Sequence, residues 1–377
     1  MKKLLRVTTQ DVSLDVLIKG QLRYMNEHGF NVVGVAEDTG RLNSVAIREG
    51  IRVINIPMHR DISIIADICS LYKLIRLFHH EQPYIVHANT PKASLLSMFA
   101  AWIVRVPVRI YTVTGLRFET ATGNFRRILK LMEMITCKCA TDVIPEGNGV
   151  ARTLVSEHIT LKPLAKIHNG NINGIDLRYF DRTQDVMART VGIRKDDVTT
   201  FVFIGRMVRD KGINELIDAF CQLNDKYPNT RMLLVGNLEE NLDPISPRTK
   251  TLIDSNPSIE HVGYQNDVRP WLASSDVLVL PSYREGFPNV ILQAGAMGLP
   301  VIVSDVNGAD EVVISGYNGI IIPRKNTDAL YSAMAEMVSK PDLRHTMSSN
   351  SRQVIAEKFN QEDIWNATLE RYNSYSV

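Results

Sequence analysis

The chain has 377 residues, which is more than one hydrophobic core usually organises, so two domains are expected. Apolar residues make up 45% and charged residues 22%, values that are ordinary for a globular protein and exclude a fibrous or low-complexity chain. The net charge of +2 conceals an asymmetry, because residues 1–178 carry an excess of positive charge and the remainder an excess of negative charge. A basic half suits nucleic acid, an anionic membrane or a phosphorylated ligand, and composition leaves these open.

The N-terminus does not read as a secretory signal, because only a few apolar residues follow Lys2 and Lys3 before the polar Thr8. No apolar run approaches the roughly 18 residues of a membrane-spanning helix. The four cysteines lack zinc-ligand spacing and are expected to be reduced. We therefore expect a cytoplasmic protein whose contact with a membrane, if it has one, is peripheral.

In the first half, short β-branched runs alternate with amphipathic stretches. This alternation is typical of a parallel sheet with helices on both faces. The predicted strands cover residues 4–8, 31–35, 52–56, 84–87, 108–113 and 142–145, and the predicted helices lie near 16–28, 63–80, 91–105 and 125–139.

The pattern restarts after Asp181–Thr199, a polar and charge-rich stretch that we interpret as a linker or domain edge. The simplest architecture is an α/β fold of two doubly wound, Rossmann-like domains facing a cleft, residues 1–178 and 179–358. Ligands in such sheets bind beyond the carboxyl ends of the strands. The predicted elements of this half are strands at 201–204, 231–235, 260–262, 277–280, 301–304 and 319–322 and a helix at 213–226.

The segment from Pro281 to Val301 carries the clearest chemistry. Glu285 and Gly286 close a loop after a strand, and Pro288 suits the first turn of a helix. A free helix N-terminus at this place offers unpaired amides and a positive dipole end to a diphosphate. An ordinary helix cap is the alternative, and spacing alone does not decide between them.

A second loop, Gly205–Gly212, also follows a strand. Gly205 permits a tight turn, while Arg206 and Lys211 have the reach and charge to bind a departing diphosphate, the arginine by bidentate hydrogen bonds. A solvated charged loop is the alternative. The placement of two cations near a glycine at a strand end favours the phosphate interpretation.

Together these motifs resemble those of glycosyltransferase family 4, whose members are retaining enzymes with the GT-B fold. The N-terminal stretches 87–93 and 107–116 are similar to those of bacterial members that build surface polysaccharides or lipid-linked oligosaccharides. The resemblance covers nearly the whole chain. The motifs in chain order are Asn173-Gly-Ile-Asp, Phe203-Ile-Gly-Arg, Lys211-Gly, Glu285-Gly-Phe-Pro-Asn-Val, Gln293-Ala and Gly298-Leu-Pro-Val.

The resemblance implies the donor site. Glu285 would contact the hydroxyls of the donor sugar, and Gln293 stands where the family has a second acid that binds the nucleotide ribose. Glutamine keeps hydrogen bonds but lacks the charge, so weaker ribose binding is expected. Arg206 and Lys211 match the family's diphosphate-binding pair. The other implied donor contacts are Gly205, Gly286, Phe287, Pro288, Asn289 and Val290, with Gly263 and Tyr264 near the base.

The acceptor side departs from the family pattern, since the glycine pair after the first strand and the histidine after the fifth are missing. Thr90 and Lys92, at a predicted helix start, are candidates for an acceptor phosphate. Thr114 and Gly115 follow the fifth strand and are further candidates. His87 is also a candidate, although a histidine beside apolar residues is more often structural.

Arg126, Arg127 and Lys130 stand among apolar residues on a predicted helix in the basic half. Basic and apolar residues together hold a peripheral helix on anionic lipid, so we expect contact with the cytoplasmic face of the inner membrane. A solvated charged face is the alternative.

We therefore expect retaining transfer of a sugar from a nucleotide diphosphate sugar, with a UDP-sugar favoured, to a hydroxyl of a lipid-linked, polyprenyl diphosphate glycan. No Asp-x-Asp pair occurs, and Arg152 replaces the third glycine of a dinucleotide fingerprint, so we expect neither a metal nor another cofactor. A nucleic-acid partner is not expected. The resemblance also implies that a helix near 359–377 packs on the first domain. Two alternatives remain: a GT-B nucleotide-sugar epimerase and a catalytically silent nucleotide-sugar-binding protein.

Overall fold

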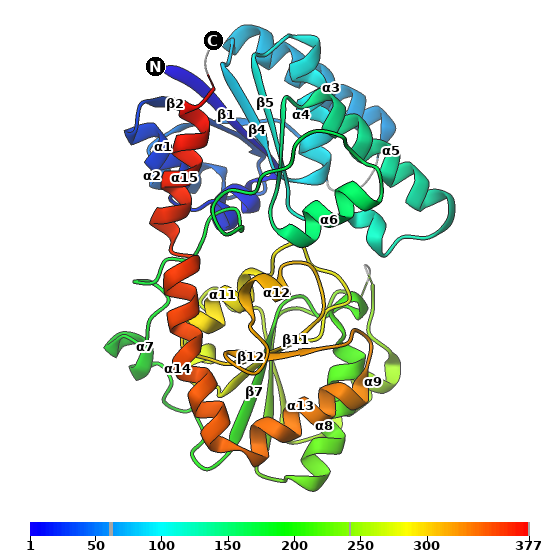
Figure 1. The fold of residues 1–377 in the computed structure, drawn as a ribbon, viewed down its shortest axis with the longest axis vertical. Helices are drawn as coiled ribbons and strands as arrows, with labels where there is room; N and C mark the ends of the chain where they lie inside the picture. The colour runs from blue at the N-terminus through cyan, green and yellow to red at the C-terminus, as the bar shows by residue number, and fades with distance from the viewer. Residues whose placement is uncertain (60–62, 241–242, 376–377) are drawn as a thin grey trace. The chain divides into compact units, whose positions relative to one another are not determined.

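The computed structural model describes residues 1–59, 63–240 and 243–375, which form two compact units (Figure 1). The first unit comprises Met1–Gly174 and Gln361–Val377, and the second comprises Ile175–Asn360. The chain therefore passes between units at residue 174/175, a few residues before the predicted boundary at 178/179.

The stretch 181–199 is part of the second unit, which starts at Ile175, so it is an edge of that unit and not a linker. It contains the short helix α7 (Gln184–Ala188), in which Val186 is fully buried. Arg189 forms an ion pair of 2.7 Å with Asp267 of the same unit. Most side chains of this stretch are exposed, which accounts for its polar composition.

The sheet of the first unit has six parallel strands in the order β3-β2-β1-β4-β5-β6. The order reverses between β1 and β4, which pair directly. β4 and β5 are buried strands rich in β-branched residues, as expected for strands covered on both faces. The strands are β1 (Lys2–Gln10), β2 (Phe30–Glu37), β3 (Arg52–Asn55), β4 (Ile85–Ala88), β5 (Val108–Val113) and β6 (Asp142–Pro145).

Helices cover both faces of this sheet. α1 (Gln21–Glu27), α2 (Leu42–Glu49) and α15 (Gln361–Asn373) contribute to the core on one face. The core on the other face is formed with α3 (Ile64–Glu81), α4 (Pro91–Ile103), α5 (Gly123–Cys139) and α6 (Asn148–Ser156).

The helix predicted near residues 16–28 is divided into a π-helical turn, Ser13–Leu17, and α1. Gly20 lies between the two pieces with a left-handed φ of 82°. A Cβ atom at this position would lie 2.7 Å from the Trp365 ring, so a glycine is required where α15 packs.

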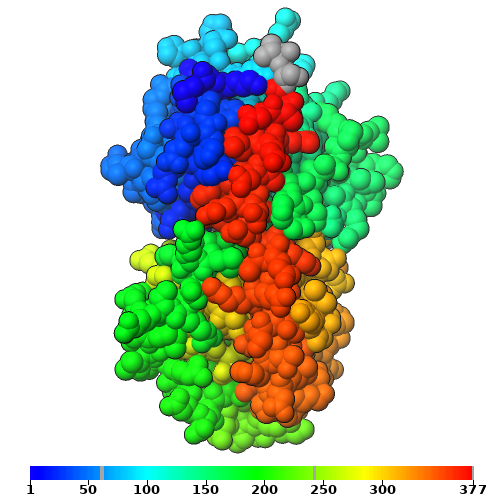
Figure 2. Space-filling view, turned by 60° about the vertical axis from the view of Figure 1, so that its left-hand side comes forward, coloured from blue at the N-terminus to red at the C-terminus, as the bar shows by residue number. Residues whose placement is uncertain are grey.

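α15 packs on the first unit, where Figure 2 shows it in red against the blue N-terminal segments. Tyr372 is fully buried, and its ring meets that of Phe30 edge to face at 5.7 Å. Arg371 donates two hydrogen bonds of 2.9 Å to the carboxylate of Asp142. Helix and sheet are thus joined by apolar packing and by an ion pair.

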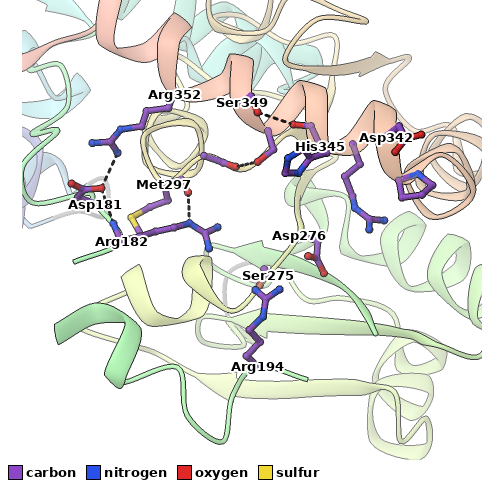
Figure 3. A pocket seen from close by; sticks show the side chains of 14 residues that line it. Asp181, Arg182, Arg194, Ser275, Asp276, Met297, Asp342, His345, Ser349 and Arg352 are labelled. Carbon is purple, nitrogen blue, oxygen red and sulfur yellow. Dashed lines mark hydrogen bonds and ion pairs between the residues drawn. The ribbon is translucent and has the colours of Figure 1, made fainter. Parts of the chain in front are cut away.

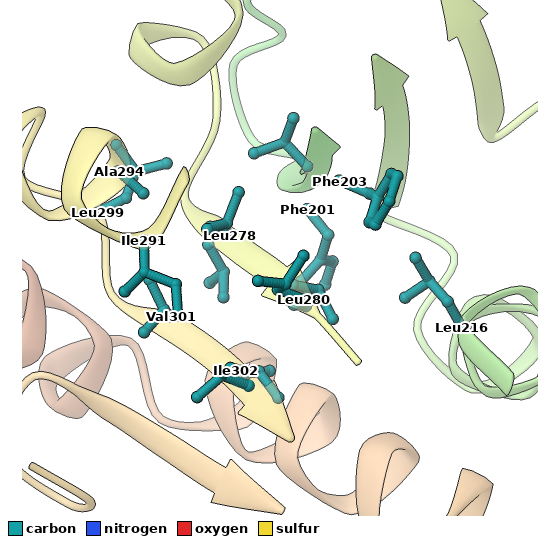
Figure 4. Close-up of a cluster of buried hydrophobic side chains, with 14 of the residues drawn as sticks. Phe201, Phe203, Leu216, Leu278, Leu280, Ile291, Ala294, Leu299, Val301 and Ile302 are labelled. Carbon is teal, nitrogen blue, oxygen red and sulfur yellow. The ribbon is translucent and has the colours of Figure 1, made fainter. Parts of the chain in front are cut away.

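The sheet of the second unit also has six parallel strands, in the order β12-β11-β10-β7-β8-β9. Its core includes Phe201, Leu278 and Ile291, with α8 on one side (Figure 4). The two doubly wound sheets confirm the predicted fold class. The strands are β7 (Thr199–Ile204), β8 (Thr230–Val235), β9 (Ile259–Gly263), β10 (Val277–Leu280), β11 (Val301–Ser304) and β12 (Gly319–Ile322).

The helices of the second unit follow the same alternation. α8 carries the predicted apolar stripe, which is buried. The helices after α7 are α8 (Ile213–Lys226), α9 (Pro247–Ser255), α10 (Arg269–Ala273), α11 (Asn289–Ala296), α12 (Ala309–Val312), α13 (Thr327–Ser339) and α14 (Pro341–Lys358). No described helix in either unit is long and apolar enough to cross a membrane. The thiols of Cys69, Cys137, Cys139 and Cys221 are all free.

Candidate active site

Two loops meet at the carboxyl edge of the second sheet, where the strand order reverses. β7 and β10 are neighbours there, although they are the first and fourth strands of the sheet in the chain. Residues 205–212 follow β7, and residues 281–288 follow β10. Such a reversal is where doubly wound sheets bind ligands. Both loops that the sequence singled out therefore lie at the expected binding position.

The loops are held together by close backbone contacts. Gly212 has a φ of 70°, and a Cβ atom on it would lie 2.1 Å from the carbonyl oxygen of Pro281. The backbone N–H of Tyr283 donates to the carbonyl of Asp210 at 2.8 Å. Arg284 lies 3.4 Å from the carboxylate of the same Asp210. These contacts fix the spacing between the two loops.

Lys211 and Glu285 form an ion pair across the two loops. Their side chains are 23% and 14% exposed, so the pair is partly enclosed yet open to a ligand. An ammonium group carries three N–H donors, so Lys211 can hold Glu285 and still bind a phosphate oxygen. Arg206 is exposed on the same loop as Lys211, directly after Gly205, whose N–H donates to Val235 at 2.9 Å.

α11 begins at the end of the second loop. Pro288 is its N-cap residue and not part of its first turn, and no side chain caps the helix. The N–H of Ile291 in this first turn already donates to the carbonyl of Pro288 at 3.0 Å, so the positive end of the helix dipole is what the helix start offers to an anion. Phe287 is buried against Phe359, with ring centroids 5.5 Å apart, so only its backbone can contact a ligand.

Farther along α11, Asn289 stands at the first position of the helix and Gln293 one turn later. Val290 packs against the core. Gln293 is partly buried, as a residue reaching along a bound nucleotide would be. The donor roles of Gly286, Asn289, Val290 and Gln293 remain predictions.

Gly263 ends β9 and accepts a hydrogen bond of 2.9 Å from the N–H of Gly236. Tyr264, the next residue, is 57% exposed. β9 lies two strands from β7 in a parallel sheet, so both residues stand at the same carboxyl edge as the two loops. Their contact with a nucleotide base remains a prediction.

Tyr283 is a residue of this site that the sequence reasoning missed. Its hydroxyl donates to Glu215 of α8 at 2.6 Å, and burial together with this bond raises the pKa of Tyr283. Lys325 lies over its ring at 4.6 Å. The bond to Glu215 joins positions 68 residues apart, so no local spacing could have revealed it. Tyr283 thus ties the loop that carries Glu285 to α8.

We expect Tyr283→Phe to lower kcat about tenfold with little change in KM, because the bond from its hydroxyl to Glu215 holds the loop that also carries Glu285. Steady-state kinetics and thermal melting measure the two effects separately. Tyr317→Phe, a partly exposed tyrosine of the same unit, is the matched control. An unchanged kcat in Tyr283→Phe would refute the positioning role. A lower kcat in Tyr283→Phe that Glu215→Ala does not share would refute it as well.

The first unit has a corresponding reversal between β1 and β4. The N–H of Thr9, near the end of β1, donates to the hydroxyl of Thr90 at 2.8 Å, and Thr90 is the N-cap residue of α4. Lys92 forms an ion pair of 2.8 Å with Asp67, so its charge is already partly balanced. The hydroxyl of Thr114, which precedes Gly115, donates to the carbonyl of Asn89 at 2.8 Å. Thr90, Lys92 and Thr114 therefore gather at one edge.

His87 is not available at this edge. It is 2% exposed, and its two ring nitrogens lie 2.6 Å from the hydroxyl of Tyr372 and 2.7 Å from that of Thr112. Burial and the charge of Arg6 hold the pKa of His87 well below its usual value. His87 is therefore a neutral, buried packing residue, the structural role expected of a histidine beside apolar residues, and not part of the proposed acceptor site.

The basic residues of α5 divide into two kinds. Arg126 and Lys130 form ion pairs of 2.7 and 2.8 Å with Glu157, so their charges are partly balanced within the unit. Arg127 is exposed. Beside it, α5 exposes an apolar face at helical spacing, which consists of Phe125, Ile128, Leu131, Met134 and Ile135.

Among the described residues, no group of three or more histidine, cysteine, aspartate or glutamate side chains is arranged to hold a metal ion.

Two family models match the chain. "Glycosyl transferase 4-like" covers residues 9–146, and "Glycosyl transferases group 1" covers residues 188–354. The first match falls in the first unit and the second match in the second unit.

The chain is also similar to curated proteins. It is 32% identical to the capsular polysaccharide biosynthesis glycosyltransferase CapM of Staphylococcus aureus, over 99% of this chain and 97% of CapM. It is 28% identical to an Escherichia coli UDP-Gal:α-D-GlcNAc-diphosphoundecaprenol α-1,3-galactosyltransferase, over 88% of this chain and 86% of that protein.

Among solved structures, HepE of Anabaena in complex with UDP-glucose has a TM-score of 0.82 at 18% identity, with both chains fully covered. A sucrose-phosphate synthase of Thermosynechococcus elongatus has a TM-score of 0.81 at 20% identity, over 99% of this chain and 98% of that one. At these low sequence identities, the structural similarity establishes the fold alone. By its matches along both units and its similarity to CapM over nearly its full length, the chain belongs to the family 4 type of glycosyltransferases and has the GT-B fold.

Proposed function

We propose that the protein transfers a sugar from a UDP-sugar to a hydroxyl of a polyprenyl diphosphate-linked glycan, with retention of the anomeric configuration. The observation that carries the proposal is the Lys211–Glu285 pair, which joins the two loops at the strand reversal of the second sheet. The uncapped start of α11 follows directly. A cation and the positive end of a helix suit the diphosphate, and a carboxylate suits the hydroxyls of the sugar.

In this proposal the diphosphate binds to Lys211, Arg206 and the positive end of α11. Negative charge develops on the diphosphate as the bond to the sugar breaks, and these groups stabilise it without a metal ion. Glu285 accepts hydrogen bonds from the sugar hydroxyls and is itself oriented by Lys211. Gln293 binds the ribose through neutral hydrogen bonds. Glu215 holds Tyr283 and, with it, the loop that carries Glu285.

The choice of donor and acceptor is supported by the relatives. The Escherichia coli relative is named for a UDP-Gal donor and a diphosphoundecaprenol-linked sugar. CapM is named for capsular polysaccharide biosynthesis. We place the acceptor phosphate near Thr90, Lys92, Thr114 and Gly115, where a helix N-terminus and an ammonium group occur together.

We further propose that α5 rests on the cytoplasmic face of the inner membrane. Leu131 and Met134 lie on one face of the helix with Arg127 and Lys138, at spacings of three and four residues. Arg126 and Lys130, which pair with Glu157, contribute less charge to lipid than their number suggests. The exposed apolar side chains would enter the headgroup region and the exposed cations would meet anionic lipid.

Ile128→Ser with Leu131→Ser should weaken binding to vesicles of phosphatidylethanolamine and phosphatidylglycerol at least tenfold, because two side chains lose apolar burial. Flotation of the protein with the vesicles measures this. Ile47→Ser with Leu161→Ser, which removes two exposed apolar side chains elsewhere in the first unit, is the matched control. Equal binding of the α5 variant and wild type would remove the membrane proposal.

The central experiment incubates the purified protein with UDP- and GDP-sugars, with and without polyprenyl diphosphate glycans, and follows nucleotide release and the product anomer. We expect release from a UDP-sugar that depends on the acceptor, that persists in EDTA and that gives a product with the donor's anomeric configuration. Conversion of the donor alone would indicate an epimerase, and an inverted product would exclude retention. Binding of UDP-sugar without turnover would indicate a silent binding protein.

A further inference from the structure

We infer that a pocket of the second unit, away from the proposed donor site, binds a sugar phosphate or a similar phosphorylated, hydroxyl-bearing small molecule. The pocket has a volume of about 690 Å³, which is within the usual range for small-molecule sites. Its walls include Ser275 and Asp276, directly before β10, and Met297 and Gly298, shortly before β11. It therefore lies at the amino edge of the sheet, whereas the proposed donor site lies at the carboxyl edge.

Three arginines give this pocket positive charge and hydrogen-bond donors. Arg182, Arg194 and Arg344 line it, and Figure 3 shows Arg182, Arg194 and His345 directed toward the region of Asp276. Among the described residues, none of the three arginines forms an ion pair with a carboxylate within 4.0 Å. Arg182 donates to the carbonyls of Met297 and Ala273 at 2.9 and 3.1 Å, and Arg344 donates to that of Met337 at 2.6 Å. Each guanidinium has five N–H donors, so most remain available to a ligand.

The remaining charges of the pocket leave it positive. Arg352 is paired with Asp181 at 3.4 Å, which leaves three arginines against Asp276 and Asp342. One oxygen of Asp276 already accepts the N–H of Thr200 at 2.8 Å.

The positive end of α14, a helix of 18 residues without a side-chain cap, adds to this charge at Pro341 and Asp342. Partial desolvation and the nearby Arg194 lower the pKa of Arg182, as expected where like charges meet.

The pocket contains both guanidinium and carboxylate groups, and this combination favours some anions over others. Guanidinium groups bind phosphate oxygens in bidentate fashion. The carboxylates of Asp276 and Asp342 would repel a second anionic group but accept hydrogen bonds from hydroxyls. A phosphate ester of a sugar presents both kinds of group, whereas inorganic phosphate presents only the anion. The pocket thus fits a sugar phosphate better than a simple anion, and it is separate from the site of the transfer reaction.

Isothermal titration with glucose 1-phosphate tests this inference, in the presence of saturating UDP to occupy the proposed donor site. We expect saturable binding to the wild type, weaker binding of inorganic phosphate and no binding of free glucose. Arg194→Gln with Arg344→Gln should lower the affinity for glucose 1-phosphate at least tenfold, because two charged donors are lost. The affinity for UDP should not change.

Arg248→Gln with Lys250→Gln is the matched control, because it removes two positive charges from exposed positions of α9 in the same unit. An equal loss of affinity in this control would show a general charge effect and overturn the inference. Absence of saturable binding to the wild type would overturn it too. Arg194→Gln alone serves if the double variant melts early, since the one hydrogen bond of the Arg194 guanidinium within the described part of the chain is long, 3.5 Å to the carbonyl of Ala273. Failure here would leave the UDP site intact and so would not bear on the transferase proposal.

Discussion

Lys211→Gln should lower kcat by a factor on the order of 10²–10³ without unfolding the protein, as the loss of a preorganised charge at a developing anion does in other enzymes. Lys211 is partly exposed and pairs with Glu285 on the neighbouring loop, so its loss changes the charge at the site and leaves the core untouched. KM for the donor should rise less than kcat falls, because the negative charge on the diphosphate grows toward the transition state. Steady-state kinetics at varied UDP-sugar concentration gives both constants.

A double-mutant cycle with Glu285→Gln sharpens this prediction. We expect Glu285→Gln to cost a similar factor, and the double variant to lose less than the product of the two factors, because the side chains are in direct contact. Arg209→Gln, two residues from Lys211 and paired with Asp243, is the matched control and should keep nearly full activity. Strictly multiplicative losses would argue that the pair does not act as a unit, and full activity of Glu285→Gln would refute its role in orienting the sugar.

Much of the fold could be predicted because parallel, buried strands carry a strong sequence signal. The strands at 108–113, 142–145, 277–280, 301–304 and 319–322 have the predicted bounds, and α8 has both its predicted ends and its predicted apolar stripe. The errors arise where tertiary contacts override local pattern. The helix near 16–28 is interrupted at Gly20 by a left-handed φ of 82°, and Trp365, more than 340 residues away, leaves room there only for a glycine. The polar stretch 181–199 fits a linker as well as a domain edge on sequence alone, because its few buried contacts are also with distant residues.

The candidate sites likewise have a part that could be predicted from local sequence and a part that depends on distant contacts. Lys211 and Glu285 could be predicted because each follows a strand in a recognisable loop, and the strand order then brings the loops together. The contacts that surround the predicted site residues could not be read from the sequence. The link between Tyr283 and Glu215, the pairing of Lys92 with Asp67 and the enclosure of His87 by Tyr372 all join distant segments. A motif therefore indicates which side chains are candidates to face a ligand. Whether the charges of those side chains are paired or buried is determined by the packing of distant segments.

The stability of the first unit should fall as the pH rises from about 5 to 7, because of Glu133 on α5. Burial raises the pKa of Glu133 to about 7, although a hydrogen bond from Tyr111 opposes the shift. No carboxylate–cation pair within 4.0 Å includes Glu133 among the described residues. The folded state therefore binds the Glu133 proton more tightly than the unfolded state, whose glutamate titrates near 4.5. The contribution of the protonated form is complete below the unfolded pKa and is lost as the pH passes through the folded pKa.

Glu133→Gln should consequently stabilise the protein at pH 8 by up to about 3 kcal/mol and leave its stability nearly unchanged at pH 4.5. Glutamine keeps the shape and an acceptor for Tyr111 but removes the buried charge. For a unit of this size the gain corresponds to a melting temperature higher by about 2–4 °C for each kcal/mol. Thermal melting of both proteins across this pH range measures the difference.

Glu157→Gln is the control, because the pKa of Glu157 is shifted in the opposite direction. Hydrogen bonds from Lys130 and Arg126 lower that pKa, so removal of the Glu157 charge should not stabilise the protein at pH 8. A wild-type stability that stays level between pH 5 and 7, or a Glu133→Gln variant with no gain at pH 8, would mean that Glu133 is ionised in the folded protein at little cost.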